Sequence, residues 1–233
     1  MIPLKVDLRL TRAAICNVFL ILVNVLVFLY EISLPPRAGQ ALIYTFGLIP
    51  SHAEMLLSSQ SVTFSRAFLP MVTSMFLHGG WMHLLGNMLF LWVFGGAVED
   101  TLGHFQYLIF YFICGVGAAV VHTIFNWGSN VPTVGASGAI SGVLGAFIVL
   151  YPAAQVATLI PALFLFFTVR IPAFLMLGYW FFLQIFSGLA SLGVGGQEAG
   201  VAWWAHVGGF LLGAILVVGK KRRKSGRVML DFS

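Results

Sequence analysis

Apolar positions divide the chain into long hydrophobic stretches that are separated by short breaks rich in polar residues, glycine or proline. The stretches lie at 13–34, 78–97, 104–125, 137–152, 171–190 and 201–219. About 20 apolar residues are needed to cross a bilayer as a helix, so the fourth stretch, which Pro152 ends, is short. The pattern predicts an all-α polytopic membrane protein, a six-transmembrane-helix bundle formed by residues 13–219.

A seventh apolar segment, Val156–Val169, does not fit this series. It has only 14 residues, contains Pro161 and is closed by Arg170 and Pro172. A seventh crossing would also place the two basic ends of the chain on opposite sides of the membrane. We therefore expect this segment to be interfacial or re-entrant.

The composition agrees with a membrane protein. Hydrophobic residues make up 60% of the chain and charged residues only 8%, against about 25% charged residues in soluble proteins. The first stretch is too long for the apolar core of a signal peptide and is expected to be a retained span. Cys16 and Cys114 both fall in apolar stretches and form neither a disulfide framework nor a metal-binding set.

The basic residues lie mainly at the two ends of the chain. Of the 12 lysines and arginines, nine are terminal: Lys5, Arg9, Arg12, Lys220, Lys221, Arg222, Arg223, Lys224 and Arg227. This positive-inside pattern predicts cytoplasmic segments at 1–12 and 220–233 and argues against a nucleic-acid partner. The outer loops then lie near 35–77, 126–136 and 191–200. The first is long and partly apolar, so we expect it to be partly embedded in the membrane interface.

Three spans begin on the same outer side with polar residues among small ones. The sequences are "LHGGWMHLLGN", "GASG" and "GVAWWAHVGG", and they place His83, Asn87, Ser137 and His206 within the first two turns of their helices. Four polar side chains from three helices therefore reach one depth. Polar groups at such a depth are costly, and they commonly mark functional sites.

Helical spacing adds a small-residue strip to two of these spans. Ser141 and Gly145 lie on the face of Ser137, while Gly209 and Gly213 lie on the face of His206. Small residues often serve only to pack membrane helices closely, and that is the simplest explanation of each strip alone. Two such faces packed together, however, would also bring Ser137 within hydrogen-bonding distance of His206.

A serine and a histidine in contact form a nucleophile and its base. A hydroxyl attacks poorly until a base takes its proton, and imidazole titrates near neutrality. Of the seven carboxylates, only Glu31 and Glu198 could approach the outer face, and neither lies on a helix expected to face the pair. The sequence therefore predicts a Ser137–His206 dyad rather than a triad with an acid.

An oxyanion hole can be assembled from the same segments. Ser137 at a helix start offers its backbone N–H, and His83 and Asn87 add side-chain donors. Gly135 and Gly138 would allow the tight turn before the helix and the close approach of a substrate backbone.

A metal site and a cofactor are not expected. His78, His83 and His206 could be drawn around a zinc ion, but intramembrane metalloproteases use an HExxH helix, and this motif does not occur in the chain. His122 and Asn126, four residues apart, are expected to hydrogen-bond locally.

These residues resemble the rhomboid family of intramembrane serine proteases. The resemblance covers about residues 70–215 and comprises "HGGWMHLLGNM", "GGAVEDTLG", "GASG" and "AHVGG" in this order. It implies a protease that hydrolyses peptide bonds in or beside the transmembrane segments of other membrane proteins within the lipid bilayer. Ser137 would be the nucleophile, His206 the general base, and His83, Asn87 and the Ser137 amide the oxyanion hole. His78 matches the motif too, either shaping the site or serving only the structure.

The resemblance also implies mobile parts and shows two departures. Span five and the loop "SLGVGGQEAG" would act as side gate and cap. Many bacterial members carry a Trp-Arg pair where this chain has Leu69 and Pro70, so the loop is expected to be anchored differently. Some members stack a tyrosine on the catalytic histidine at the position of Ser141, so another group must hold the His206 ring.

Two other functions stay open at this point. A non-catalytic relative could bind and escort membrane clients through the same groove, although such relatives usually lose the serine or the histidine. A small transporter would be expected to show inverted repeats and midplane charges, and neither is evident. We expect a multi-pass protein of a bacterial plasma membrane with its active site near the outer face.

Overall fold

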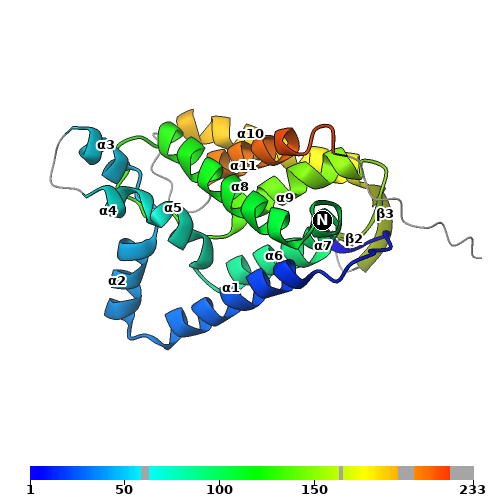
Figure 1. The fold of residues 1–233 in the computed structure, drawn as a ribbon, viewed down its shortest axis with the longest axis horizontal. Helices are drawn as coiled ribbons and strands as arrows, with labels where there is room; N and C mark the ends of the chain where they lie inside the picture. The colour runs from blue at the N-terminus through cyan, green and yellow to red at the C-terminus, as the bar shows by residue number, and fades with distance from the viewer. Residues whose placement is uncertain (59–62, 163–164, 194–201, 221–233) are drawn as a thin grey trace, which may run out of the picture.

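The computed structural model describes residues 1–58, 63–162, 165–193 and 202–220, and it is mostly helical, as predicted. The longer helices run side by side through the molecule, with a group of short helices at one end and a small sheet at the other (Figure 1). The helices are α1 (Ile15–Ser33), α2 (Pro36–Phe46), α3 (Ser51–Leu57), α4 (Phe64–Phe68), α5 (Pro70–Thr73), α6 (Trp81–Phe90), α7 (Gly96–Leu102), α8 (His104–Phe125), α9 (Ser137–Leu150), α10 (Ala173–Gly193) and α11 (Trp203–Leu216).

Among the described residues, four helical segments are long and apolar enough to cross a membrane. They are Ile15–Ser33, Trp81–Leu102, His104–Phe125 and Ala173–Ser191. The helices α9 and α11 are apolar but shorter, 14 residues each, which corresponds to about 21 Å at the helical rise. All six predicted stretches thus contain an apolar helix, and the number of crossings stays a prediction.

Helix α9 is the central helix of the bundle. Most of its side chains are buried, and it packs against α8 and α11. The contact with α11 is made by glycines: a Cβ atom on Gly145 would lie 2.0 Å from the carbonyl oxygen of Phe210. On the opposite helix, a Cβ atom on Gly213 would lie 2.0 Å from the carbonyl oxygen of Gly142. The two predicted small-residue strips therefore face each other and bring the backbones into contact.

The structure adds a small sheet that the apolar pattern did not predict. Strands β1 (Ile2–Val6), β2 (Gln155–Ala162) and β3 (Leu165–Pro172) form an antiparallel sheet in the order β1-β2-β3. The segment expected to be interfacial or re-entrant is thus a β-hairpin, and the N-terminus pairs with it, Ile2 opposite Leu159. The β-branched and aromatic residues of the hairpin favour strands. Strand β1 contains Pro3 and lies at the edge of the sheet, where proline is tolerated.

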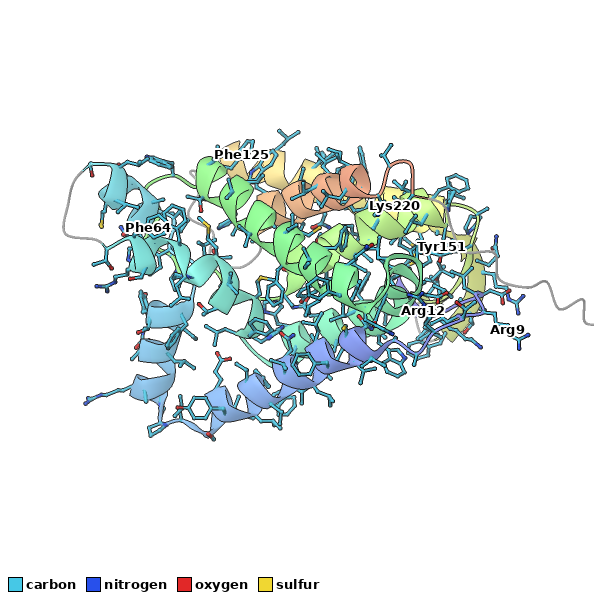
Figure 2. The ribbon with its side chains drawn as sticks, viewed as in Figure 1. Arg9, Arg12, Phe64, Phe125, Tyr151 and Lys220 are labelled. Atoms are coloured by element: carbon cyan, nitrogen blue, oxygen red, sulfur yellow. The ribbon has the colours of Figure 1, made fainter. Side chains whose placement is uncertain are left out.

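The basic residues near both ends of the described chain lie toward the sheet. Arg9, Arg12 and Lys220 are at or near that end of the molecule, whereas Phe64 and Phe125 are at the opposite end (Figure 2). This arrangement places positive charge at one end of the bundle. The positive-inside pattern predicts that this end faces the cytoplasm.

The second long span contains a π-helical turn, Leu91–Gly95, between α6 and α7. The wider turn leaves a carbonyl free, and the Asn17 side-chain amide donates to the carbonyl oxygen of Leu91 at 3.0 Å. The Tyr107 hydroxyl donates to the Asn17 amide oxygen at 2.7 Å. A Cβ atom on Gly95 would lie 1.9 Å from that oxygen, so only glycine fits there.

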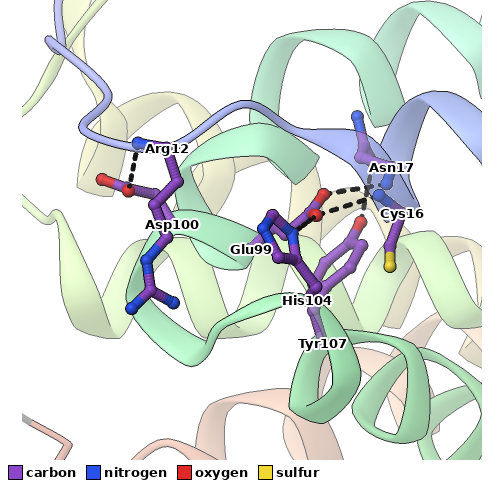
Figure 3. Close-up of polar contacts among 7 residues, drawn as sticks. All are labelled: Arg12, Cys16, Asn17, Glu99, Asp100, His104 and Tyr107. Atoms are coloured by element: carbon purple, nitrogen blue, oxygen red, sulfur yellow. Dashed lines mark hydrogen bonds and ion pairs between the residues drawn. The ribbon is translucent and has the colours of Figure 1, made fainter.

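Glu99 and Asp100 lie in α7 and are buried. The Glu99 carboxylate accepts hydrogen bonds from the backbone N–H groups of Cys16 (2.9 Å) and Asn17 (2.8 Å) and contacts the imidazole of His104 (Figure 3). It thereby satisfies unpaired N–H groups at the start of α1 and lies at the positive end of that helix.

Asp100 fixes the chain that leads into α1. Its carboxylate accepts hydrogen bonds from the backbone N–H of Arg12 at 2.9 Å and from the Thr11 hydroxyl at 2.7 Å (Figure 3 shows the first of these). The two acidic residues of "GGAVEDTLG" are thus accounted for as anchors of the first span.

Replacing Glu99 by glutamine is expected to destabilise the fold by about 1–3 kcal/mol, because one buried backbone N–H would face an amide NH₂ instead of an acceptor. Thermal unfolding in detergent measures the change. The same substitution at Glu54, an exposed glutamate of α3, is the control. Equal stability of the two variants would contradict the anchoring role.

The long loop between the first two spans is built from α2, α3, α4, α5 and a 3₁₀ turn, and its anchoring does not involve a Trp-Arg pair. Pro70, at the position of that pair, is buried as the first residue of α5. The loop is instead tied to residues 129–135: Leu48 and Thr133 exchange two backbone hydrogen bonds, and the Gly135 N–H donates to the carbonyl oxygen of Ser74. The loop therefore holds the segment that enters α9.

Candidate active site

A pocket of about 240 Å³ lies between α6, α9, α10 and α11. Its lining includes His83, Asn87, Ser137 and His206, the four polar residues that the sequence pattern places at one depth. The remaining lining residues are Met82, Gly86, Phe90, Ile140, Ser141, Leu144 and Trp180. The pocket is therefore an apolar cavity with a few convergent polar groups, the usual make-up of a ligand site.

Ser137 and His206 are in direct contact. The distance between the Ser137 Oγ and the His206 Nε2 is 2.8 Å, which is a hydrogen bond between side chains of different helices. Ser137 is the first residue of α9, and the chain reaches it through Gly135 at a φ of +128°, a conformation that favours glycine. Ser141, one turn later, donates its hydroxyl to the carbonyl oxygen of Ser137 at 2.6 Å.

His83 and Asn87 lie against the turn before Ser137. A Cβ atom on Gly135 would lie 2.7 Å from the His83 imidazole Nε2 and 3.6 Å from the Asn87 amide nitrogen. Gly135 thus gives both side chains room beside the backbone that enters α9. Gly138 has a different role, since a Cβ atom there would lie 2.7 Å from the Cβ of Ala118 on α8, so its small size serves helix packing.

His78 supports Asn87 and does not line the pocket. Its Nε2 lies 3.0 Å from the Asn87 amide nitrogen, and the ring is buried. Its backbone N–H donates to the Glu31 carboxylate at 3.1 Å. Glu31 therefore holds the segment before α6 rather than the His206 ring, and Glu198 lies outside the described residues, as does most of the loop expected to act as a cap.

The second nitrogen of His206 is bonded to a residue that the sequence pattern did not single out. The Nδ1 of His206 lies 2.8 Å from the Gln184 Oε1 on α10. The ring also contacts the indoles of Trp180 and Trp203, with centroids 5.9 and 6.3 Å away. These three residues surround the imidazole in place of a stacked tyrosine. A lone glutamine inside the apolar stretch "GYWFFLQIF" was the signal that could have identified Gln184.

His122, Asn126 and Glu99 have local partners. The Asn126 amide lies 3.2 Å from the His122 Nδ1, which confirms the predicted local hydrogen bond, and Thr133 lies at 2.9 Å from the other ring nitrogen. Cys16, Glu99 and His104 present possible metal ligands within 4.8 Å of one another. The backbone and imidazole contacts of Glu99 account for its burial without an ion.

Fold and site together define a class: a polytopic helical membrane protein in which a serine and a histidine from two helices meet in a pocket. Residues 65–223 match the Rhomboid domain family, and this match covers more than half of the chain. The chain belongs to the rhomboid family.

Curated relatives agree with this assignment. The chain is 41% identical over 76 residues to Rhomboid-like protein 11, chloroplastic, of Arabidopsis thaliana, covering 33% of this chain and 27% of the relative. It is 40% identical over 78 residues to Rhomboid protease GluP of Bacillus subtilis (strain 168), covering 34% and 15%. It is 29% identical over 174 residues to Rhomboid protein 1, mitochondrial, of Saccharomyces cerevisiae, covering 69% and 43%. The chain therefore matches only 27% of the length of Rhomboid-like protein 11 and 15% of the length of Rhomboid protease GluP.

Proposed function

We propose that this protein is an intramembrane serine protease that hydrolyses peptide bonds in or beside the transmembrane segments of other membrane proteins. The observation that carries the proposal is the 2.8 Å contact between Ser137 and His206 in a pocket between membrane helices. Membership of the rhomboid family and similarity to a relative named as a rhomboid protease support it.

In the proposed reaction His206 Nε2 takes the proton of the Ser137 hydroxyl as the oxygen attacks the scissile carbonyl carbon. The acyl-enzyme forms when the tetrahedral intermediate collapses and the same proton passes to the leaving amine. Water, deprotonated by His206, then attacks the acyl-enzyme. When the second tetrahedral intermediate collapses, the acid product leaves and His206 returns the proton to the Ser137 oxygen. The chemistry uses no cofactor and no metal.

The oxyanion of each tetrahedral intermediate would be stabilised by the Ser137 backbone N–H, the His83 imidazole and the Asn87 amide. Ser137 opens α9, so its N–H is free of an intrahelical partner and lies at the positive helix end. Asn87 is held by His78, and both donors lie beside the Gly135 turn. A donor of this kind contributes about 10²–10³-fold in rate.

The predicted setting completes the proposal. Transmembrane proteins would reach the pocket from the bilayer, and both termini would be cytoplasmic with the pocket near the outer face. We propose a bacterial plasma membrane for the protein, while its relatives include mitochondrial and chloroplastic proteins.

Covalent capture tests the proposal. A fluorophosphonate probe added to the detergent-solubilised protein is expected to phosphonylate one serine, because only an activated hydroxyl attacks phosphorus at neutral pH. Mass spectrometry of the digested protein should place the adduct on Ser137 and leave Ser141 unmodified. An adduct on another serine would refute the assignment, and an unlabelled protein that still binds transmembrane peptides would favour a non-catalytic escort.

A further inference from the structure

We propose that Gln184 is a positioning residue that holds His206 in the tautomer required of a general base. The inference rests on the proposed function of Ser137 and His206, and it adds a third group, from a third helix, to that pair. The observation behind it is a chain of hydrogen bonds that runs from Trp180 through Gln184 and His206 to Ser137.

The first link fixes the orientation of the Gln184 amide. Its nitrogen Nε2 lies 3.2 Å from the backbone carbonyl oxygen of Trp180, one turn earlier in α10. A carbonyl oxygen can only accept, so the amide atom facing it must be the NH₂ group. The amide oxygen is therefore the atom that faces His206. The Gln184 side chain is also buried, at 5% exposure, which limits other orientations.

The second link fixes the proton on His206. The Gln184 Oε1 has no hydrogen, so the 2.8 Å contact is a hydrogen bond only when the His206 Nδ1 carries the proton. A neutral imidazole has one N–H, which leaves Nε2 with a lone pair. Nε2 is the atom 2.8 Å from the Ser137 Oγ, so the hydroxyl must donate to it. This is the proton arrangement that precedes nucleophilic attack.

The role differs from that of an acid in a triad. Gln184 is neutral, so it orients the ring and accepts from the imidazolium that forms during the reaction without adding a negative charge. It bonds the ring on the Nδ1 side, away from the reacting oxygen. Removing it should therefore lower kcat and leave KM unchanged, since no contact with substrate is lost.

Kinetics and NMR on the full-length protein in detergent test the proposal. Gln184→Leu and Gln184→Met remove the amide oxygen that accepts from His206. We expect kcat for cleavage of a transmembrane-segment substrate to fall by about 10–100-fold at constant KM. This loss is smaller than the loss of about 10⁴-fold that follows when a charged partner of the histidine is replaced and the wrong tautomer forms. Gln184→Glu keeps an acceptor of the same length, charged or protonated, and should recover most of the activity. Gln155→Leu removes a half-buried glutamine of β2, outside the pocket, as a matched control and should behave as the wild type.

The ¹⁵N spectrum of histidine-labelled protein reports the tautomer directly. His206 signals are assigned by their loss in His206→Asn. We expect the Nδ1-protonated form in the wild type and in Gln184→Glu, and a shift toward the Nε2-protonated form in Gln184→Leu and Gln184→Met. Unchanged kcat and an unchanged tautomer in these two variants would overturn the proposal.

The two proposals fail in different ways. A wild-type protein that neither cleaves nor is phosphonylated refutes the protease function, and the tautomer shift then still decides the role of Gln184. An active wild type whose Gln184→Leu and Gln184→Met variants keep both the wild-type kcat and the Nδ1-protonated tautomer refutes only the role of Gln184.

Discussion

Replacing Ser137 by alanine is expected to lower the turnover of a transmembrane-segment substrate by about 10⁶-fold, the scale of the loss when the nucleophile of a serine protease is removed. The reason is that the hydroxyl 2.8 Å from His206 Nε2 is the nucleophile of the proposed pair. The measurement is the cleavage rate of a fluorescent substrate in proteoliposomes. Binding of the substrate should persist, because alanine fills the same place in the pocket without the oxygen.

The neighbouring serine gives a matched control. Ser141 lies one turn along α9, lines the same pocket and is hydrogen-bonded to the carbonyl oxygen of Ser137. Ser141→Ala removes the same atom from the same helix face, and we expect at most about a tenfold loss, the scale of one neutral hydrogen bond. Turnover by Ser137→Ala at the rate of Ser141→Ala would rule out Ser137 as the nucleophile.

Replacing Gly213 by alanine is expected to destabilise the fold by about 3 kcal/mol or more, the upper range for overpacking. The added Cβ would lie 2.0 Å from the carbonyl oxygen of Gly142 and 2.5 Å from its Cα. These are backbone atoms of a buried helix and cannot turn aside as a side chain would, so α9 and α11 must separate. Thermal unfolding in detergent measures the loss, and phosphonylation by the fluorophosphonate probe should fall with it.

Gly178→Ala is the control for the change from glycine to alanine itself. Gly178 lies in α10, and a Cβ atom there meets no atom within 4 Å. Alanine favours a helix over glycine by about 0.5–1 kcal/mol, so this variant should be slightly more stable than the wild type. Two variants of equal stability would show that the contact between α9 and α11 is looser than the structure indicates.

Much of the helical framework follows from the sequence because apolar length and helical spacing are local properties. The stretch 104–125 coincides with α8, and Pro152 explains why α9 ends early. The spacing of Gly209 and Gly213 was sufficient to predict which face of α11 meets α9. The approach of Ser137 to His206 follows from that contact.

Features that depend on pairing between distant segments could not be predicted in this way. The apolar segment Val156–Val169 has no period that distinguishes a buried strand from an interfacial stretch, and its partner Ile2–Val6 lies at the other end of the chain. The buried contacts of Glu99 could not be predicted either. Its burial depends on the N–H groups at the start of α1, which the sequence does not place beside it.

Gln184 shows a similar limit at the site. A glutamine in an apolar helix indicates that some polar partner exists, but its spacing within α10 does not reveal which residue of another helix it meets. The partner became clear only when α10 and α11 were placed side by side.

The enclosed position of α9 in the bundle affects how the protein would respond to membranes of different thickness. A bilayer that is too thick or too thin acts on the helices that face acyl chains, through tilt and local deformation. Helices α1, α8 and α10 expose large apolar side chains along their lengths, whereas α9 is enclosed by protein and joined backbone to backbone with α11. A change in lipid chain length should therefore first alter the tilt of α1, α8 and α10. The distance between the Ser137 oxygen and the His206 ring should stay nearly constant.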